Sequence, residues 1–254
     1  TEVTVKLLPK PQVAKVLLAA FDSVEKAGRA VGDIIAAGII PGGLEMMDNL
    51  SIRAAEDFIH AGYPVDAEAI LLCELDGVEA DVHDDCARVS EVLKLAGATE
   101  VRLAKDEAER VRFWAGRKNA FPAVGRISPD YYCMDGTIPR RELPGVLKGI
   151  SDLSEQFGLR VANVFHAGDG NLHPLILYDA NKPGEIEKAE AFGADILRCC
   201  VELGGVLTGE HGVGLLKRAF LRDELGDAQH ALQEKIKAVF DPHGILNPGK
   251  VFTP

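Results

Sequence analysis

Two short polar segments of this chain carry residue types that bind metal ions. The first, residues 166–173, reads His-Ala-Gly-Asp-Gly-Asn-Leu-His and lies between two apolar runs. The second, residues 208–212, reads Thr-Gly-Glu-His-Gly and follows the apolar pair Val206-Leu207. A catalytic metal ion is held by neutral imidazoles and a carboxylate that converge on one point. The two segments offer both kinds of ligand, and we predict that they meet in space.

A turn between two strands would bring the two histidines of the first segment together. His166 and His173 stand at the ends of a six-residue turn, and the ends of a hairpin lie ~5 Å apart, one strand spacing. Glu210 comes where a short strand is predicted to end, which makes it the natural third ligand. Two histidines and one carboxylate leave coordination positions open for substrate or water, as catalytic sites do. We therefore predict a metal site made of His166, His173 and Glu210.

Two further side chains have chemistry of their own. His211 is not needed as a ligand, and an imidazole beside a metal-bound hydroxyl is a good general base because its pKa lies near working pH. Arg117 could hold a substrate carboxylate through two parallel hydrogen bonds. From the residues alone, an arginine on a helix surface is the plainer interpretation of Arg117.

A lone histidine near a strand end is usually structural, so the prediction of a metal site depends on the pairing of the two segments.

The elements that must position these segments alternate between strand and helix. Apolar runs and alternating patterns predict strands over residues 13–21, 44–48, 68–75, 99–104, 131–138 and 206–207. Helical periodicity predicts helices over residues 23–38, 49–61, 78–96, 106–119, 139–158, 186–200 and 227–240, with a loop at 121–130. No Gly-x-Gly-x-x-Gly follows any strand, which argues against a dinucleotide-binding unit. Short strands with helices to one side favour an α+β sandwich of the split βαβ type.

Composition excludes several classes of protein. The 254 residues are 47% hydrophobic and 26% charged, as in an ordinary globular domain. The net charge of −11 argues against nucleic acid as a partner, because phosphate binding needs a basic surface. No run of 18 apolar residues is present, so we expect no transmembrane segment. Five scattered cysteines without a Cys-x-x-Cys pair indicate neither a disulfide framework nor a zinc ribbon, and favour a reducing cytosol.

Five motifs, taken together, resemble one family. They are residues 41–48 (Pro-Gly-Gly-Leu-Glu-Met-Met-Asp), 131–139 (Tyr-Tyr-Cys-Met-Asp-Gly-Thr-Ile-Pro), 166–173, 208–214 and 241–250 (Asp-Pro-His-Gly-Ile-Leu-Asn-Pro-Gly-Lys). In this order they resemble the C-terminal half of the FAD-linked 2-hydroxyacid oxidases and dehydrogenases, in the vanillyl-alcohol oxidase superfamily. The likeness is greatest to the FAD-binding subunits of bacterial glycolate oxidases and also extends to the D-lactate dehydrogenases.

The resemblance implies a fold and a domain organisation. The expected fold is α+β, an antiparallel sheet flanked by helices in a duplicated ferredoxin-like arrangement, as in the cap domain of FAD-linked oxidases. Residues 1–8 would be the last strand of an FAD-binding domain that is missing here. Residues 9–215 would form the cap and substrate-binding domain, and residues 216–254 a C-terminal helix and a tail that faces the flavin. We therefore expect the chain to be a fragment, inactive without the FAD-binding domain.

The resemblance also implies a reaction. A small D-2-hydroxy acid such as glycolate or D-lactate would be oxidised to the 2-oxo acid, with FAD as cofactor. Zinc or manganese at the three predicted ligands would hold the substrate, and His211 would take the hydroxyl proton while hydride passes to FAD. Arg117 matches the family's carboxylate-binding arginine, which reverses the plainer interpretation. Asn171, Asn247 and Lys250 are assigned to the flavin by the same likeness.

Two positions depart from the relatives that act on dicarboxylates. By the same resemblance, those relatives carry a lysine and an asparagine at the positions that Cys133 and Leu175 occupy in this chain. The change to uncharged side chains favours a small monocarboxylate over a diacid.

Two other functions stay open at this point. A metal-dependent hydrolase would use the same ligands to activate water, with His211 as the base, and would need no flavin. A non-catalytic module would bind the subunits of an oxidase complex through its surface, and a homodimer is a further partner to consider. The expected location is the cytoplasm, with any membrane association made through partner subunits.

Overall fold

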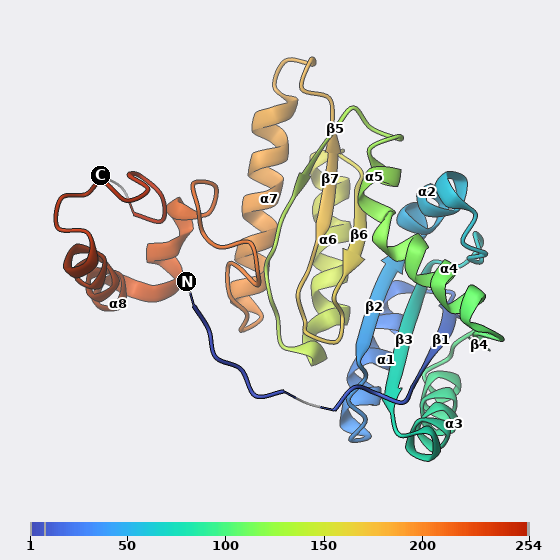
Figure 1. The fold of residues 1–254 in the computed structure, drawn as a ribbon. Helices are drawn as coiled ribbons and strands as arrows, with labels where there is room; N and C mark the ends of the chain where they lie inside the picture. The colour runs from blue at the N-terminus through green and yellow to red at the C-terminus, as the bar shows by residue number, and fades with distance from the viewer. Residues whose placement is uncertain (1, 8, 253–254) are drawn as a thin grey trace.

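One seven-stranded sheet, built from two similar halves, runs through the molecule. The computed structural model describes residues 2–7 and 9–252, and its strands follow the order β4-β1-β3-β2-β6-β7-β5. Every paired strand is antiparallel to its neighbour. Figure 1 shows the two halves side by side, with the last helix and the tail set apart from the sheet.

The first half is a ferredoxin-like unit with one extra helix. Its elements are β1 (Val13–Phe21), α1 (Val24–Ala36), β2 (Gly43–Asp48), α2 (Asn49–Ile59), β3 (Ala69–Gly77), α3 (Glu79–Leu95) and β4 (Glu100–Leu103). The strand order β4-β1-β3-β2 is that of a split βαβ unit, into which α2 is inserted between β2 and β3.

The second half repeats this plan with its fourth strand reduced to a single bridge. Its elements are α4 (Glu107–Lys118), α5 (Ala120–Val124), β5 (Asp130–Cys133), the 3₁₀ turn η1 (Arg140–Glu142), α6 (Leu143–Phe157), β6 (Val161–Phe165), β7 (Pro174–Tyr178) and α7 (Glu185–Glu202). The order β6-β7-β5 mirrors β2-β3-β1, and the bridge between Thr137 and Val206 stands where a fourth strand would pair. The expected α+β fold with a duplicated ferredoxin-like arrangement is therefore confirmed.

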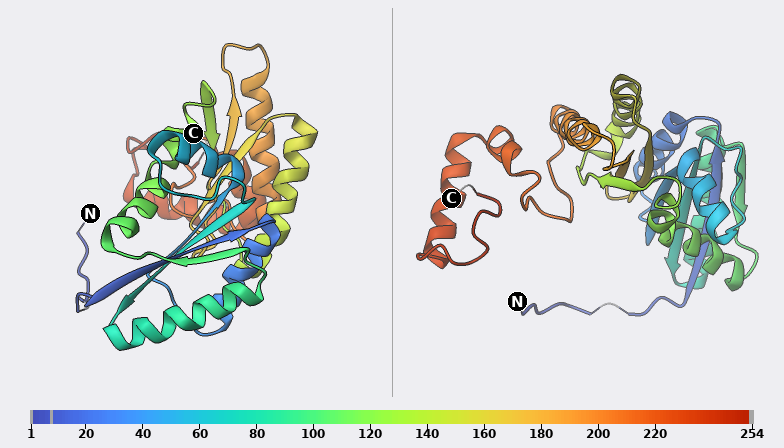
Figure 2. Two further views of the ribbon diagram at one scale, coloured as in Figure 1. Left: turned by 90° about the vertical axis from the view of Figure 1, so that its right-hand side faces the viewer. Right: turned by 90° about the horizontal axis from the view of Figure 1, so that it is seen from above.

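Helices cover both faces of the sheet, because its central strands are buried on both sides. In β1, Leu17 and Ala19 pack in one core with α1, α3, α6 and α7. Leu18 and Ala20, which point the other way, pack in a second core with α2, α4 and α5. The expectation of helices to one side was wrong, since the apolar run Val16–Phe21 serves two cores; Figure 2 shows the layers from two further directions.

Most predicted elements are found, and the exceptions have local causes. The predicted loop 121–130 contains α5, and the predicted strand 131–138 ends at Cys133. The last helix, α8 (Arg218–Phe240), begins before residue 227, with a break in its helical backbone at Gly226 (φ 74°). Residues 2–7 are exposed and form no strand; residues 1 and 8 lie outside the described part, and their assignment to another domain's strand stays a prediction.

The C-terminal helix and tail contribute little to the core. Of the residues of α8, all of which the structure describes, only Leu221 is buried. The right-hand view of Figure 2 shows this helix and the tail away from the sheet. Within residues 2–7 and 9–252, no helix has the length and apolar character needed to cross a membrane.

The bridge at Val206 requires glycine at the position before it. A Cβ added to Gly205 would lie 1.8 Å from the carbonyl oxygen of Thr137, whereas one added to Gly32 in α1 would meet nothing within 4 Å. We predict that Gly205→Ala lowers the free energy of unfolding by about 1–3 kcal/mol, because the backbone at residue 205 must move away from that of Thr137. As a control, Gly32→Ala should raise it by about 0.5–1 kcal/mol. Urea denaturation measures both, and an unchanged Gly205→Ala protein would contradict the prediction.

Candidate metal and substrate site

The two histidines of the first segment meet as the hairpin geometry predicted. His166 follows the last residue of β6, and His173 precedes the first residue of β7. Because these strands pair antiparallel, the two imidazole rings lie with centroids 5.1 Å apart, edge to face. The side chain of His166 is about one-third exposed, whereas that of His173 is buried.

The second segment brings a carboxylate to the same point. Glu210 Oε1 lies 3.1 Å from His173 Nε2 and 3.8 Å from His166 Nε2. One ligand atom from each of the three residues lies within 4.8 Å of the other two. The predicted meeting of the two polar segments is therefore present in the structure.

The state of His173 suits a metal ligand. Its side chain is 3% exposed, and neither ring nitrogen has an aligned hydrogen-bond partner among the described residues, although Glu210 is close. Burial, and then the charge of His166, lower the pKa of His173 to about 4, so its imidazole is neutral near pH 7. A buried imidazole without a partner is costly, and a divalent cation at Nε2 would satisfy it. The donor set of two imidazoles and a carboxylate fits zinc or manganese.

A buried carboxylate orients the other histidine. His166 Nδ1 lies 2.9 Å from Glu45 Oε1, and Glu45, on β2, is 9% exposed. This hydrogen bond raises the pKa of His166, while burial opposes the shift. With Nδ1 bonded to Glu45, the other nitrogen, Nε2, faces Glu210. A carboxylate behind a ligating histidine is the usual means of fixing its ring and its tautomer.

Arg117 lies behind the same carboxylate. Its Nε donates to Glu45 Oε2 at 2.9 Å, and its Nη2 lies 2.9 Å from the same oxygen. Arg117 is 7% exposed, so the interpretation as a helix-surface arginine was wrong. Nη2 lacks an aligned hydrogen-bond acceptor within the described part of the chain. The guanidinium therefore reaches the cluster through Glu45.

His211 stands beside the predicted ligands. Its ring stacks on that of His173, with centroids 5.0 Å apart and planes 6° from parallel. Its Nε2 lies 3.7 Å from Glu210 Oε1, and its side chain is 45% exposed. This imidazole can exchange protons with water while it touches the cluster, which is the geometry a general base needs.

Besides Glu45, two charged residues of the site were not predicted from the sequence. Asp135 is fully buried, and Lys217, 5% exposed, donates to its Oδ2 at 3.1 Å. Burial alone would raise the pKa of Asp135, but hydrogen bonds from Thr208, the His211 amide and Lys217 hold it well below its usual range. Burial lowers the pKa of Lys217, and the contact with Asp135 opposes this shift.

A second cluster of possible ligands shares residues with the first. Asp135, His173 and His211 also offer ligand atoms within 4.8 Å of one another. Asp135 already accepts hydrogen bonds from the loop that carries His211, so its oxygens are less available than those of Glu210. The sequence carries a signal for these two acids, because Asp135 and Glu45 each interrupt an apolar stretch in one of the five motifs.

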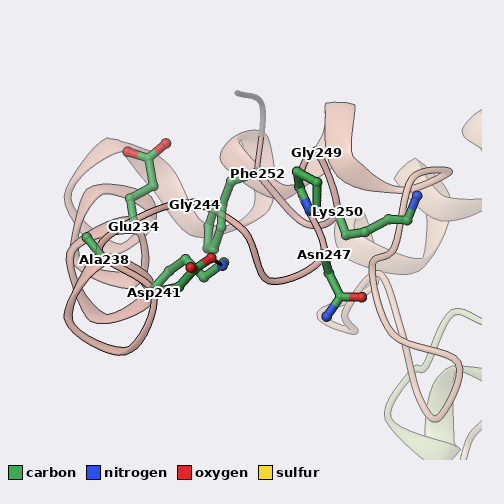
Figure 3. Close-up of a pocket in the computed structure, with 10 residues that line it drawn as sticks. Glu234, Ala238, Asp241, Gly244, Asn247, Gly249, Lys250 and Phe252 are labelled. Atoms are coloured by element: carbon green, nitrogen blue, oxygen red, sulfur yellow. Dashed lines mark hydrogen bonds and ion pairs between the residues drawn. The ribbon is translucent and has the colours of Figure 1, made fainter.

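The three residues assigned to the flavin lie in two places. Asn171 is in the cluster, 6% exposed, forms a bridge with His166, and has an Oδ1 without a hydrogen-bond partner among the residues described. Asn247 and Lys250 are exposed in the tail and line a cavity of about 370 Å³ beside α8. Figure 3 shows the cavity and the two side chains, and its lining includes no residue of the histidine cluster.

Comparison with known proteins places this geometry in a family. The model of the FAD-linked oxidases, C-terminal domain, matches residues 10–251. The chain belongs to this family. The resemblance predicted from the five motifs is thereby confirmed.

The curated relatives of this family member are about twice its length. The glycolate oxidase subunit GlcD of Escherichia coli is 74% identical over 98% of this chain and 50% of the relative. The GlcD subunit of Bacillus subtilis is 39% identical over 99% of this chain and 54% of the relative. A probable mitochondrial D-lactate dehydrogenase of Danio rerio is 31% identical over 99% of this chain and 50% of the relative. The chain thus spans about half of each.

Solved structures share the fold of this family member. A p-cresol methylhydroxylase with substrate bound matches with a TM-score of 0.73 at 16% identity, over 96% of this chain and 53% of that one. The 4-ethylphenol oxidase from Gulosibacter chungangensis matches with a TM-score of 0.71 at 15% identity, over 97% of this chain and 55% of that one. These two likenesses show the fold of the oxidase C-terminal domain.

The contact between Glu45 and His166 gives a prediction for metal affinity. We expect Glu45→Gln to weaken zinc binding about 10–100-fold, because the amide no longer fixes the His166 ring as strongly. Glu74→Gln is a matched control, since Glu74 accepts hydrogen bonds from Arg110 and Trp114 at 2.7 Å and 2.6 Å without contacting a histidine. Competition with a chromophoric chelator measures the affinities. Equal affinities of the two variants would contradict the prediction.

Proposed function

We propose that this chain supplies the metal- and substrate-binding half of a flavin-dependent oxidoreductase that converts a small D-2-hydroxy acid, such as glycolate or D-lactate, to the 2-oxo acid. The observation that carries the proposal is the convergence of His166, His173 and Glu210 within 4.8 Å, beside a half-exposed His211. The identity of 74% to a glycolate oxidase subunit supports the choice of substrate class.

The residues of the cluster divide the work of the reaction. A bound divalent ion would lower the pKa of a hydroxyl that coordinates it, and FAD would accept the hydride. His166, His173 and Glu210 would hold that ion, which would bind oxygen atoms of the substrate. His211 Nε2 takes the hydroxyl proton, and the exposure of its ring allows the proton to leave to water.

Arg117 is proposed to bind the substrate carboxylate. The support is the match to the carboxylate-binding arginine of the family, together with the position of its guanidinium beside Glu45 and the histidine cluster. Cys133 and Leu175 pair across β5 and β7, and neither brings a positive charge that a second carboxylate would require. Burial raises the pKa of the Cys133 thiol to about 12, so this side chain stays neutral. These features favour a monocarboxylate substrate.

Asn171, Asn247 and Lys250 are proposed to contact FAD. The exposed amide of Asn247 and ammonium of Lys250 are hydrogen-bond donors suited to the carbonyl oxygens of a flavin ring. They line one cavity with residues of α8, which supports a shared ligand. Most contacts with FAD are proposed to come from the half of the curated relatives that this chain does not span.

Partner subunits of an oxidase complex are part of the proposal. The support is that the relatives named GlcD are subunits of a glycolate oxidase. A homodimer and a cytoplasmic location stay predictions from the sequence.

The proposal is tested by substrate binding to the zinc-loaded chain. We expect calorimetric titration to show binding of glycolate and D-lactate that is lost on chelation and in His173→Gln, because a ligand nitrogen is removed. His230→Gln is the matched control: His230 lies in α8, outside the cluster, and should leave binding unchanged. His211→Gln should keep zinc affinity within about threefold, since a stacked neighbour and not a ligand is changed.

Three outcomes would contradict the proposal. The first is absence of glycolate and D-lactate binding by a chain that holds zinc. The second is hydrolysis of 4-nitrophenyl acetate that depends on the metal and on His211, which would establish the alternative of a metal-dependent hydrolase. With added FAD and a dye acceptor, the chain alone is expected to show no turnover of glycolate, and robust turnover would refute its role as one half of an oxidase.

A further inference from the structure

The loop that carries Glu210 and His211 has no regular secondary structure, yet it is fixed to one buried carboxylate. Asp135, fully buried, lies two residues after the end of β5. Its carboxylate accepts hydrogen bonds from five donors: Thr208 Oγ1 (2.7 Å), the amides of Gly209 (3.1 Å), Glu210 (3.2 Å) and His211 (2.9 Å), and Lys217 Nζ (3.1 Å). Three successive backbone amides therefore point at a single side chain.

In this loop the side chains are exposed, while the backbone is hydrogen-bonded to a buried group. The side chains of Glu210 and His211 are 52% and 45% exposed, whereas the backbone beneath them is tied to an interior group. Thr208 Oγ1 also accepts from the amide of Gly212 at 2.9 Å, which closes the loop on itself. Successive amides around one anion form a nest, which elsewhere binds a ligand; here the chain's own carboxylate fills it.

Lys217 completes the arrangement by neutralising the charge. Besides its contact with the Asp135 carboxylate, Nζ donates to the Asp135 carbonyl oxygen at 2.8 Å. A buried carboxylate that is paired and saturated with donors has little remaining capacity to bind a cation. Asp135 is therefore suited to hold the loop without competing with Glu210, although its Oδ1 lies only 3.7 Å from His173 Nε2.

We propose that Asp135 is a positioning residue, whose carboxylate fixes the backbone of residues 208–211 so that Glu210 meets His166 and His173 and His211 stacks on His173. The inference rests on the proposed function for its chemistry, since it assigns a second tier of residues to that metal site. It adds Thr208 and Lys217 as the groups that keep Asp135 in place.

The test compares zinc affinity, cobalt spectra and amide exchange in three variants of the chain. Asp135→Asn, which puts donor hydrogens against donors, should weaken zinc binding about 10–100-fold and shift the visible absorption of the cobalt-loaded chain. Thr208→Val removes one hydrogen bond and should weaken zinc binding by up to about tenfold. Deuterium exchange of the amides of residues 209–211, measured without metal, should be faster in both variants.

The third variant, Asp241→Asn, controls for the loss of a buried carboxylate. Asp241 is 6% exposed, accepts from the amides of Ile245 (2.9 Å) and Leu246 (3.0 Å), and pairs with Lys237, so its surroundings resemble those of Asp135. It lies in the tail and has no contact with His166, His173 or His211. Asp241→Asn should leave the zinc affinity and the cobalt spectrum as in the unmodified chain.

Each failure has its own signature. Zinc affinity within about twofold of the unmodified chain, a normal cobalt spectrum and unchanged exchange in Asp135→Asn would overturn the inference while the proposed metal site stands. If Asp135→Asn does not fold, the same unchanged values in Thr208→Val overturn it. Absence of zinc binding by the unmodified chain refutes the metal site itself. Even in that case, slow exchange of the amides of residues 209–211 in the unmodified chain, together with faster exchange in Thr208→Val, would support their hydrogen bonds to Asp135.

Discussion

The pairing of β2 with β6 is the constraint on which the site depends. This short antiparallel ladder, Met46 with Phe165 and Met47 with Val164, is the only pairing between strands of the two halves among the residues described. Glu45 precedes it on one strand and His166 follows it on the other. Farther along, the Gly168 amide donates to the Leu44 carbonyl at 2.8 Å, so the polar turn is fastened to the first half as well. The register of this β2–β6 pairing places the Glu45 carboxylate behind the His166 imidazole. A slip by one residue would turn the two side chains to opposite faces of the sheet.

The charges beneath the cluster are arranged as pairs. Glu45 is matched by Arg117 and Asp135 by Lys217, and each pair is nearly inaccessible to water. Removing one member of such a pair leaves an uncompensated buried charge, which is far more costly than the pair itself is favourable. The pairs therefore give the site little net stability but confine it to one geometry. Glu210 and His211, by contrast, are about half exposed, and both lie against the imidazole of His173.

Among the parts of this site that the sequence predicted, the pair of His166 and His173 is set by local structure. His166 and His173 are joined by one hairpin, so strand spacing alone brings their rings together. The bond from His166 to Glu45 spans 121 residues, and that from Lys217 to Asp135 spans 82. No local pattern fixes such distances, because they depend on how the two halves pair. The family resemblance supplied the roles of the ligands, but the buried groups behind them required the three-dimensional arrangement.

Tertiary contacts also account for elements whose form differs from the sequence prediction. The short helix α5 packs against α2, and tertiary contact rather than intrinsic propensity accounts for its helical form. Strand β5 ends at Cys133, and Asp135, two residues beyond it, is fully buried and accepts hydrogen bonds from the loop that carries Glu210. Where the first half completes its sheet with β4, the second keeps only the bridge at Val206. In a fourth strand the backbone amides of residues 209–211 would donate to a neighbouring strand. Here they donate to Asp135 instead. Residues 208–211 therefore form a loop and not an edge strand, and extending the strand through them would take the amides of residues 209–211 away from Asp135.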